Sequence, residues 1–458
     1  MNKDLKDEAA LQDNGDSQLL ENTSTNDVLP QPSRLTLLMG SLRNYRTLAH
    51  FSSASVGLNV ATLIANFLIL RWLEPETLGL WQSLLLIQTY SLIIQGGVFN
   101  GLNRELPYSM GNGDERAVME LAGTAQAVSI FGAILLSICA AGVLFFPLNI
   151  SIRLGAAVVF ICSAGAIYRN YLTVTYRADR AFATLAHIRM VETVMVLFTL
   201  PLIYYFEYAG LAGRFVIITF LGVILNHIYR PLHVKTQFST SHLIRLLKVG
   251  LPIYICGYLL TVSSTFPRLI LLSEDGLKQV GLFAPVYAVM GMMQMLPESI
   301  AQYIYPHMSY RYGKTGDPES LWPMAWKTAT GVVVLSLPGL VVCMFAVPWI
   351  IEWFFPKYVE SAVAIKWGLI SGVFLGGAIS VNALLSLKAW LWLTVYTAFQ
   401  VISTFLLSFS LYRIAGNPLE GVAAGYAIAQ GLSFPVGMYC IYRATHVRML
   451  TPETVAID

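Results

Sequence analysis

The sequence has 458 residues, of which 56% are hydrophobic and only 12% are charged, with a formal net charge of +3. Soluble domains carry about 25% charged residues, so the composition excludes an ordinary soluble protein, and the small net charge argues against a nucleic-acid partner. No charged residue occurs between Glu120 and Arg153 or from Thr328 to Ile351. A membrane-spanning helix needs only about 20 apolar residues, so we predict a polytopic, all-α membrane protein.

The first 33 residues are polar and lack the apolar core of a cleaved signal peptide. We therefore expect a disordered cytoplasmic tail over residues 1–45. Apolar runs bounded by charged, proline or glycine residues then predict about twelve spanning helices. Six lie in the first half, near 49–70, 77–101, 120–147, 154–176, 183–206 and 209–228. Six lie in the second half, near 247–272, 281–304, 324–350, 360–384, 387–412 and 420–442.

Basic residues in the connections predict the orientation of these helices. If the N-terminus is cytoplasmic, sixteen basic residues fall on its side, here named the near side: Arg34, Arg43, Arg46, Arg104, Arg116, Arg177, Arg180, Arg230, Lys235, Arg245, Lys248, Arg311, Lys314, Lys388, Arg443 and Arg448. Six fall on the opposite, far side: Arg71, Arg153, Arg214, Lys278, Lys357 and Arg413. Lys and Arg stay in the cytoplasm during insertion, so both termini are expected inside, with the protein in the cell inner membrane.

A sequence repeat relates the two halves of the chain. Gly79-Leu80-Trp81, at the start of the second predicted helix, matches Gly281-Leu282-Phe283, at the start of the eighth, 202 residues later. Each half holds an even number of helices and enters the membrane with the same polarity, so we expect two six-helix lobes related by a pseudo-two-fold axis along the membrane normal. The expected parts are an N-terminal lobe (46–230), a cytoplasmic linker (231–246), a C-terminal lobe (247–443) and a cytoplasmic tail (444–458).

Three stretches carry a family resemblance: EPETLGLWQ (74–82), RELP (104–107) and the long segment from Pro267 to Gly313. They resemble the polysaccharide-transporter family, the flippases of lipid-linked oligosaccharides, whose superfamily also contains multidrug exporters and the lipid II flippase. The resemblance covers roughly residues 45–445 and implies two lobes with alternating access for a polyprenyl-diphosphate-linked sugar. The family commonly has an acidic residue before the arginine that corresponds to Arg268, whereas this chain has Pro267 there.

Ionisable residues inside predicted spanning helices are functional candidates, because each costs about 2.5–3.5 kcal/mol to insert. We expect four of them to line a cavity and bind a diphosphate or sugar: Arg169, Arg189, Arg268 and Lys366. An arginine fork holds phosphate oxygens bidentately and stays charged. Glu192 and Glu298 are candidates for coupling or for ion pairs.

Simpler roles stay open for each of these residues. Arg189 and Glu192 lie three positions apart on one predicted helix and could form an ion pair with each other. Arg169, Arg268 and Lys366 lie close enough to predicted helix ends for their charged groups to reach the interface. The sequence has no nucleotide-binding loop, no cluster with metal-ligand spacing and no catalytic constellation, so we expect no cofactor, no metal and no enzymatic activity.

The sequence therefore predicts a flippase that moves polyprenyl-diphosphate-linked oligosaccharide from the cytoplasmic to the outer leaflet, for O-antigen, capsule or exopolysaccharide synthesis. The expected partners are that substrate, membrane lipid and a polysaccharide polymerase with its export machinery. A multidrug or cation antiporter of the same superfamily is one alternative. An integral-membrane polysaccharide polymerase or ligase is another, although the predicted far-side connections are short for an enzyme that works on the outer face.

Overall fold

The computed structural model describes residues 34–446, and the described residues are almost entirely helical, with no β-strand among them. Most of the tail expected over 1–45 and the last residues of the tail expected over 444–458 lie outside this range. The first-half elements are α2 (Arg34–Trp72), α3 (Pro75–Ser91), η1 (Leu92–Gln95), α4 (Val98–Gly111), α5 (Glu115–Val143), α6 (Ile150–Ala178), α7 (Phe182–Phe198) and α8 (Leu200–Ile228). The second-half elements are α9 (Thr240–Ser263), α10 (Phe266–Glu274), α11 (Leu277–Leu282), α12 (Ala284–Thr315), η2 (Pro318–Leu321), α13 (Trp322–Phe354), η3 (Pro356–Ser361), α14 (Ala362–Gly377), η4 (Ala378–Val381), α15 (Asn382–Ser386), α16 (Trp390–Ile414) and α17 (Pro418–His446).

Each of the twelve ranges predicted from the sequence is occupied by helix, so the all-α prediction is confirmed. Nine helical segments within the described residues are long and apolar enough to cross a membrane. Two predicted helices, near 247–272 and 281–304, are each built from two pieces, because a proline interrupts the backbone hydrogen bonds. Pro267 and Pro285 each stand in the first turn of a new helix, where a missing N–H costs nothing.

A tight turn separates the fifth and sixth predicted spans. It lies at Glu207, whose backbone has φ 45° inside the continuous range of α8. A Cβ on Gly210 would collide with the carbonyl of Leu202, so the two arms of this turn are in backbone contact. Only glycine allows that approach, and the turn therefore gives the two helices a short far-side connection.

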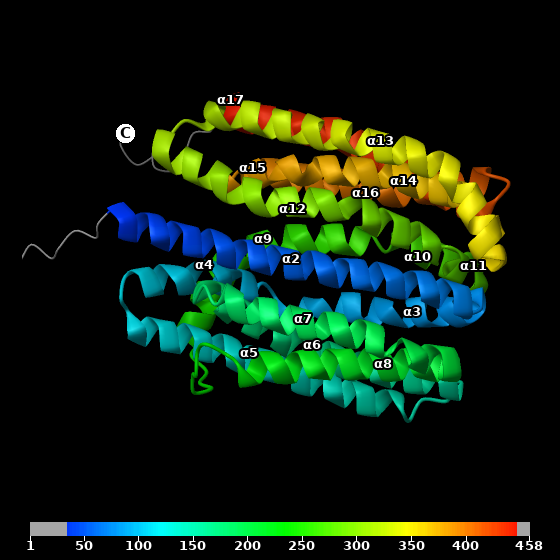
Figure 1. Ribbon diagram of the computed structural model, residues 1–458, viewed down its shortest axis with the longest axis horizontal. Coiled ribbons are helices and arrows are strands. Elements are labelled where there is room, and N and C mark those ends of the chain that lie inside the picture. The colour runs from blue at the N-terminus through cyan, green and yellow to red at the C-terminus, as the bar shows by residue number, and fades with distance from the viewer. Residues whose placement is uncertain (1–33, 447–458) are drawn as a thin grey trace, which may run out of the picture. The chain divides into compact units, whose positions relative to one another are not determined.

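The helices of the first and second halves of the chain form two groups, α3–α8 and α12–α17 (Figure 1). Buried apolar side chains form three clusters. One contains residues of α4–α7 and the start of α9, such as Leu121 and Tyr176, and another contains residues near the ends of α12, α16 and α17, such as Ile441. The third contains residues from both halves, such as Trp81 and Phe283. This shared cluster lies at the predicted far side, whereas the near-side cluster at the ends of α12, α16 and α17 is separate from that of α4–α7.

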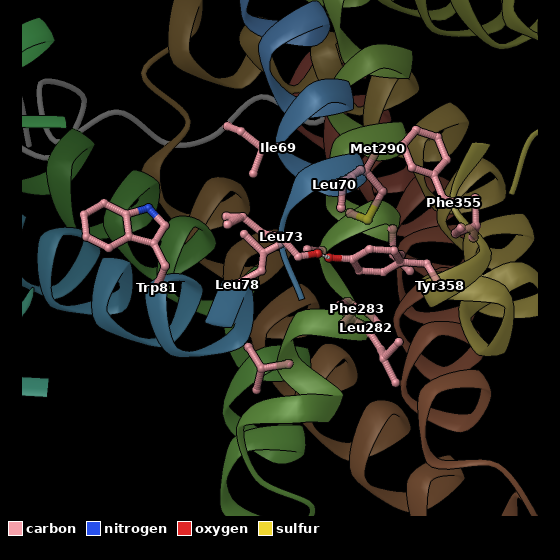
Figure 2. Packing of buried hydrophobic residues seen from close by; sticks show 14 of the residues in the cluster. Ile69, Leu70, Leu73, Leu78, Trp81, Leu282, Phe283, Met290, Phe355 and Tyr358 are labelled. Atoms are coloured by element: carbon pink, nitrogen blue, oxygen red, sulfur yellow. Dashed lines mark hydrogen bonds between the residues drawn. The ribbon is translucent and has the colours of Figure 1, made fainter. Parts of the chain in front are cut away.

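Figure 2 shows part of the shared cluster, in which Leu73 and Trp81 lie on one side and Phe283 and Tyr358 on the other. The Tyr358 hydroxyl donates a hydrogen bond of 3.4 Å to the carbonyl of Leu73. Lys357 adds an ion pair with Glu74, with Nζ and Oε1 2.6 Å apart. In a bilayer, close packing rather than exclusion of water holds helices together, so this dense contact closes the far side between the lobes.

The repeated glycines meet each other within this far-side contact. A Cβ on Gly79 would collide with the carbonyl of Leu277 and lie 2.8 Å from the nitrogen of Gly281. A Cβ on Gly281 would collide with the carbonyl of Pro75 and lie 2.9 Å from the nitrogen of Gly79. Leu277 is 202 residues after Pro75, just as Gly281 is 202 residues after Gly79. Such reciprocal contacts are the mark of a two-fold axis, and the repeat seen in the sequence is thus a structural pseudo-two-fold.

On the near side, the second predicted span packs against the start of the seventh. Gly97 and Gly101 lie against the backbone of α9 at Gly250 and Leu246, with no room for a Cβ. Arg245 donates from Nε to Oε2 of Glu105 at 2.8 Å. The segment between α8 and α9, expected over 231–246, is extended only as far as Ser239, since α9 begins at Thr240.

Candidate functional site

Arg268 lies where the second half meets the first. α9 ends at Ser263 and α10 begins at Phe266, because Pro267 cannot donate the hydrogen bond that would continue the helix. The break leaves backbone and hydroxyl groups free to bond elsewhere. The Tyr287 hydroxyl donates to the carbonyl of Ser264 at 2.8 Å, and the Tyr90 and Thr265 hydroxyl oxygens lie 2.7 Å apart. The break thereby places Arg268, near the start of α10, beside Gln82 of α3 and Tyr287 of α12.

The guanidinium of Arg268 contacts neutral groups and takes part in none of the ion pairs found among the described residues. Its Cζ lies 4.4 Å from the centre of the Tyr287 ring, and its Nη1 donates to Oε1 of Gln82 at 3.3 Å. Its Nε is buried without a hydrogen-bond partner in the described part of the chain. A cation held by a ring face and an amide is stabilised but not neutralised. The site therefore carries an uncompensated positive charge that favours an anionic ligand.

Tyrosines extend this site along α9. The Tyr254 and Tyr258 rings stack with centroids 5.5 Å apart. Their hydroxyls donate to carbonyls near the end of α3: Tyr254 to Leu92 at 2.6 Å and Tyr258 to Tyr90 at 3.2 Å. These bonds satisfy carbonyls freed where α3 changes to the 3-10 turn η1. Arg268 was a sequence candidate, whereas Gln82, Tyr90 and Tyr287 were missed because no local pattern places them beside it.

Arg169 and Glu192 form a second charged centre, inside the first lobe. Nη2 of Arg169 on α6 lies 2.7 Å from Oε1 of Glu192 on α7, and the glutamate side chain is only 3% exposed. Gly222 on α8 covers the pair so closely that a Cβ there would lie 2.8 Å from Arg169 Nη1. The sequence allowed Glu192 to pair with Arg189 on the same helix. In the structure, the Glu192 carboxylate instead pairs with Arg169 on the neighbouring helix α6.

Arg189 lies close to this pair. It lines a small cavity with Arg169, Arg177, Phe51 and Asn226, and the cavity volume of about 10 Å³ leaves room for one water molecule at most. The cavity lies among α2, α6, α7 and α8 and takes no residue from the second half. Arg169 and Arg189 are therefore grouped with each other, but apart from Arg268.

Lys366 and Glu298 stand apart from both centres. Lys366 lies half-buried on α14 and Glu298 lies exposed on α12. Neither takes part in the ion pairs found among the described residues. The four predicted cations thus occupy three places: a first-lobe cavity, the contact between the halves, and α14.

We expect Arg169→Ala to lower the free energy of unfolding by about 3–5 kcal/mol, because it leaves the buried Glu192 carboxylate without a partner. Arg116→Ala is the matched control, since the Arg116–Glu120 pair has a similar separation of 2.9 Å but an 88% exposed arginine, and exposed pairs contribute little to stability. The double change Arg169→Met with Glu192→Leu should recover much of the loss. Thermal unfolding in detergent measures all three, and equal losses for Arg169→Ala and Arg116→Ala would contradict the assignment.

No family model and no curated protein sequence matches this chain. Solved structures do. An inward-facing multidrug resistance MATE family transporter of the MOP superfamily matches with a TM-score of 0.69 and 14% identity, covering 86% of this chain and 96% of that one. The lipid II flippase MurJ, in an inward closed conformation, matches with a TM-score of 0.64 and 13% identity, covering 86% and 89%. This chain shares the fold of these two solved structures.

An outward-facing MATE family transporter of the MOP superfamily also matches, with a TM-score of 0.65, 13% identity and coverage of 88% and 96%. These neighbours are transporters or flippases rather than enzymes, and their identities bear on the fold alone. The nine long apolar helical segments among the described residues, together with the shared fold, indicate a multi-pass membrane protein.

Proposed function

We propose that this protein is a flippase that moves a polyprenyl-diphosphate-linked oligosaccharide from the cytoplasmic to the outer leaflet of the inner membrane. The observation that carries the proposal is the uncompensated guanidinium of Arg268, held between the two halves by Gln82 and Tyr287. A diphosphate is the charged part of such a lipid. Arginine can hold it bidentately, and binding between two lobes couples the cargo to their relative movement.

The packing supports alternating access with the far side closed. The buried cluster shared by both halves, and the reciprocal Gly79–Gly281 contact, join the lobes at the predicted outer side. On the near side, α9 packs against α4, but the ends of α12, α16 and α17 form a buried cluster of their own, separate from that of α4–α7. We infer an inward-facing state that receives the sugar-bearing headgroup from the cytoplasm, while the prenyl tail stays in the lipid. Opening of the far-side contact would release the headgroup outside.

A multidrug or cation antiporter is the second candidate, because MATE family transporters share the fold. Coupling in that alternative would need an acidic residue deep in the first lobe. Glu192 is the acidic residue there, and Arg169 already pairs with it in a buried contact. This pairing favours the flippase.

The polymerase or ligase alternative requires catalytic groups on the far side. The far-side connections in the structure are short: they lie at 73–74, 144–149, 275–276 and 415–417 and at the Glu207 turn, with the longer segment 355–361 forming η3. Connections this short leave no room for a catalytic domain on the far side. This supports a transporter that supplies its product to a separate polymerase and export machinery for O-antigen, capsule or exopolysaccharide.

Deletion of the gene tests this function. We expect lipid-linked oligosaccharide repeats to accumulate in the inner leaflet of the deletion strain, where an impermeant glycosidase added to intact cells cannot cut them. The wild-type gene should restore outer-leaflet exposure. Accumulation of unpolymerised repeats on the outer face would instead indicate a polymerase, and a changed drug susceptibility with normal polysaccharide would indicate an antiporter.

A further inference from the structure

An open apolar groove runs along the surface of the first lobe, separate from the site at Arg268. It consists of two adjoining hollows with volumes of about 630 and 760 Å³. The first lies beside α5 and reaches Tyr168 on α6 and His227 on α8, and the second lies between α5, α6 and the far-side half of α8. Ser137 and Ala141 line both hollows, so the groove is continuous.

The length of the first hollow suits a lipid chain. It follows α5 from Gln126 to Ala141, a rise of about 22 Å at 1.5 Å per residue. One leaflet of the hydrocarbon core is about 15 Å thick. Ile134 and Ile138, which line this hollow, are more than half exposed in the protein alone. An acyl chain lying along them would cover apolar surface from near the interface to past the middle of the bilayer.

The near-side end of the groove is polar and basic. The Tyr168 hydroxyl oxygen lies 2.8 Å from Nδ1 of His227, and Nη1 of Arg230 lies 2.9 Å from the same nitrogen. Gln126 also lines this end, is 92% buried, and its Oε1 has no partner among the described residues. A buried carbonyl without a donor costs about 1–3 kcal/mol, so this end is built for a ligand that donates a hydrogen bond.

The linker after α8 adds charge at the same end. Its residues alternate: Leu232 and Val234 pack against the first-lobe cluster, whereas His233 and Lys235 are exposed. The linker lies over the start of α5, because a Cβ on Gly123 would lie 2.7 Å from the carbonyl of Lys235. Arg230 and Lys235 therefore both lie beside the near-side end of the groove.

We propose that this groove binds an anionic phospholipid of the near-side leaflet. One acyl chain lies along α5, and the phosphate contacts the cluster of Tyr168, His227 and Arg230. Rotation of the Gln126 side chain toward the groove would let its unpartnered Oε1 accept a hydrogen bond from a glycerol headgroup, as in phosphatidylglycerol. Charge complementarity and this need for a donor favour a lipid over an apolar helix of another protein or of a second copy, neither of which would satisfy the polar end.

Native mass spectrometry of the full-length protein tests the site, with phosphatidylglycerol or phosphatidylcholine titrated into detergent-purified, delipidated samples. We expect the wild type to retain phosphatidylglycerol at least fivefold better than phosphatidylcholine. Arg230→Gln and Gln126→Leu should each reduce that preference, whereas Arg311→Gln, which changes an exposed near-side arginine of α12, should not. Ala141→Phe, which fills the point where the hollows join, should reduce the binding of both lipids.

Ala398→Phe, at an exposed alanine of α16 outside the groove, is the control for added bulk. Thermal unfolding without added lipid separates loss of binding from loss of folding, and each of the three groove variants gives an independent measurement. Phosphatidylglycerol retention that survives both Arg230→Gln and Ala141→Phe would overturn the proposal. A protein dimer that Ala141→Phe dissociates would overturn it as well, because the groove would then bind a second copy.

Discussion

Arg268→Gln is expected to reduce transport of the lipid-linked oligosaccharide by about 10- to 100-fold, because one charge-assisted hydrogen bond contributes about 1.5–3 kcal/mol and each 1.4 kcal/mol is tenfold. Arg268→Lys should keep part of the activity, since lysine retains the charge but loses the planar fork. The amount of protein in the membrane should stay normal, because Gln82 and Tyr287 are neutral and lose no counter-ion. Outer-leaflet exposure of the lipid-linked repeats in the deletion strain measures the effect.

Arg413→Gln is the matched control for this prediction. Arg413 also lies over an aromatic ring, with Cζ 5.1 Å from the centre of Phe409, but it pairs with Glu274 at 3.0 Å. Its charge is therefore compensated, and we expect near-normal transport. A fully active Arg268→Gln variant, or an equal loss of transport in Arg413→Gln, would show that the uncompensated charge of Arg268 is not needed for transport.

Gly79→Val is expected to prevent closure of the far side and to reduce transport more than tenfold. The valine side chain would collide with the carbonyl of Leu277, a backbone atom that cannot move aside as a flexible side chain can. Gly281→Val should have the same effect, because its side chain would meet the carbonyl of Pro75 in the reciprocal position. The double variant should be little worse than either single one, since both disrupt the same contact.

Labelling of a cysteine at Leu78 reports this opening directly. Leu78 is 3% exposed and belongs to the shared far-side cluster, so an impermeant maleimide added outside cells should label Leu78→Cys weakly in a variant without the native cysteines. Adding Gly79→Val should increase the labelling. Gly257→Val on α9, where no atom lies within 4 Å of the new Cβ, is the control. Unchanged labelling with Gly281→Val would contradict the far-side gate.

Much of the fold could be predicted from the sequence, because long uncharged runs and short connections leave few ways to cross a bilayer. The repeat at Gly79 and Gly281 went further: it predicted the symmetry, although not that the two glycines touch. The helix breaks at Pro267 and Pro285 could be anticipated from proline chemistry, but the contacts that these breaks make possible could not. Only the packing shows that the break before Arg268 places this residue against Gln82.

The candidate site could be predicted only in part. Counting charges in apolar runs found Arg169, Arg189, Arg268 and Lys366, because a buried charge is conspicuous in any sequence. Their grouping depends on which helices are neighbours. Sequence spacing allowed Arg189 to pair with Glu192, whereas in the structure α6 brings Arg169 to it. The neutral partners of Arg268 lie on two other helices, α3 and α12, so no local pattern could indicate them.

A structure of the protein with bound polyprenyl-diphosphate oligosaccharide tests the central claim most directly. The account predicts a phosphate oxygen about 2.7–2.9 Å from the guanidinium of Arg268, with the sugar between the lobes and the prenyl tail in lipid. A headgroup bound elsewhere, with Arg268 still held only by Gln82 and Tyr287, would contradict it.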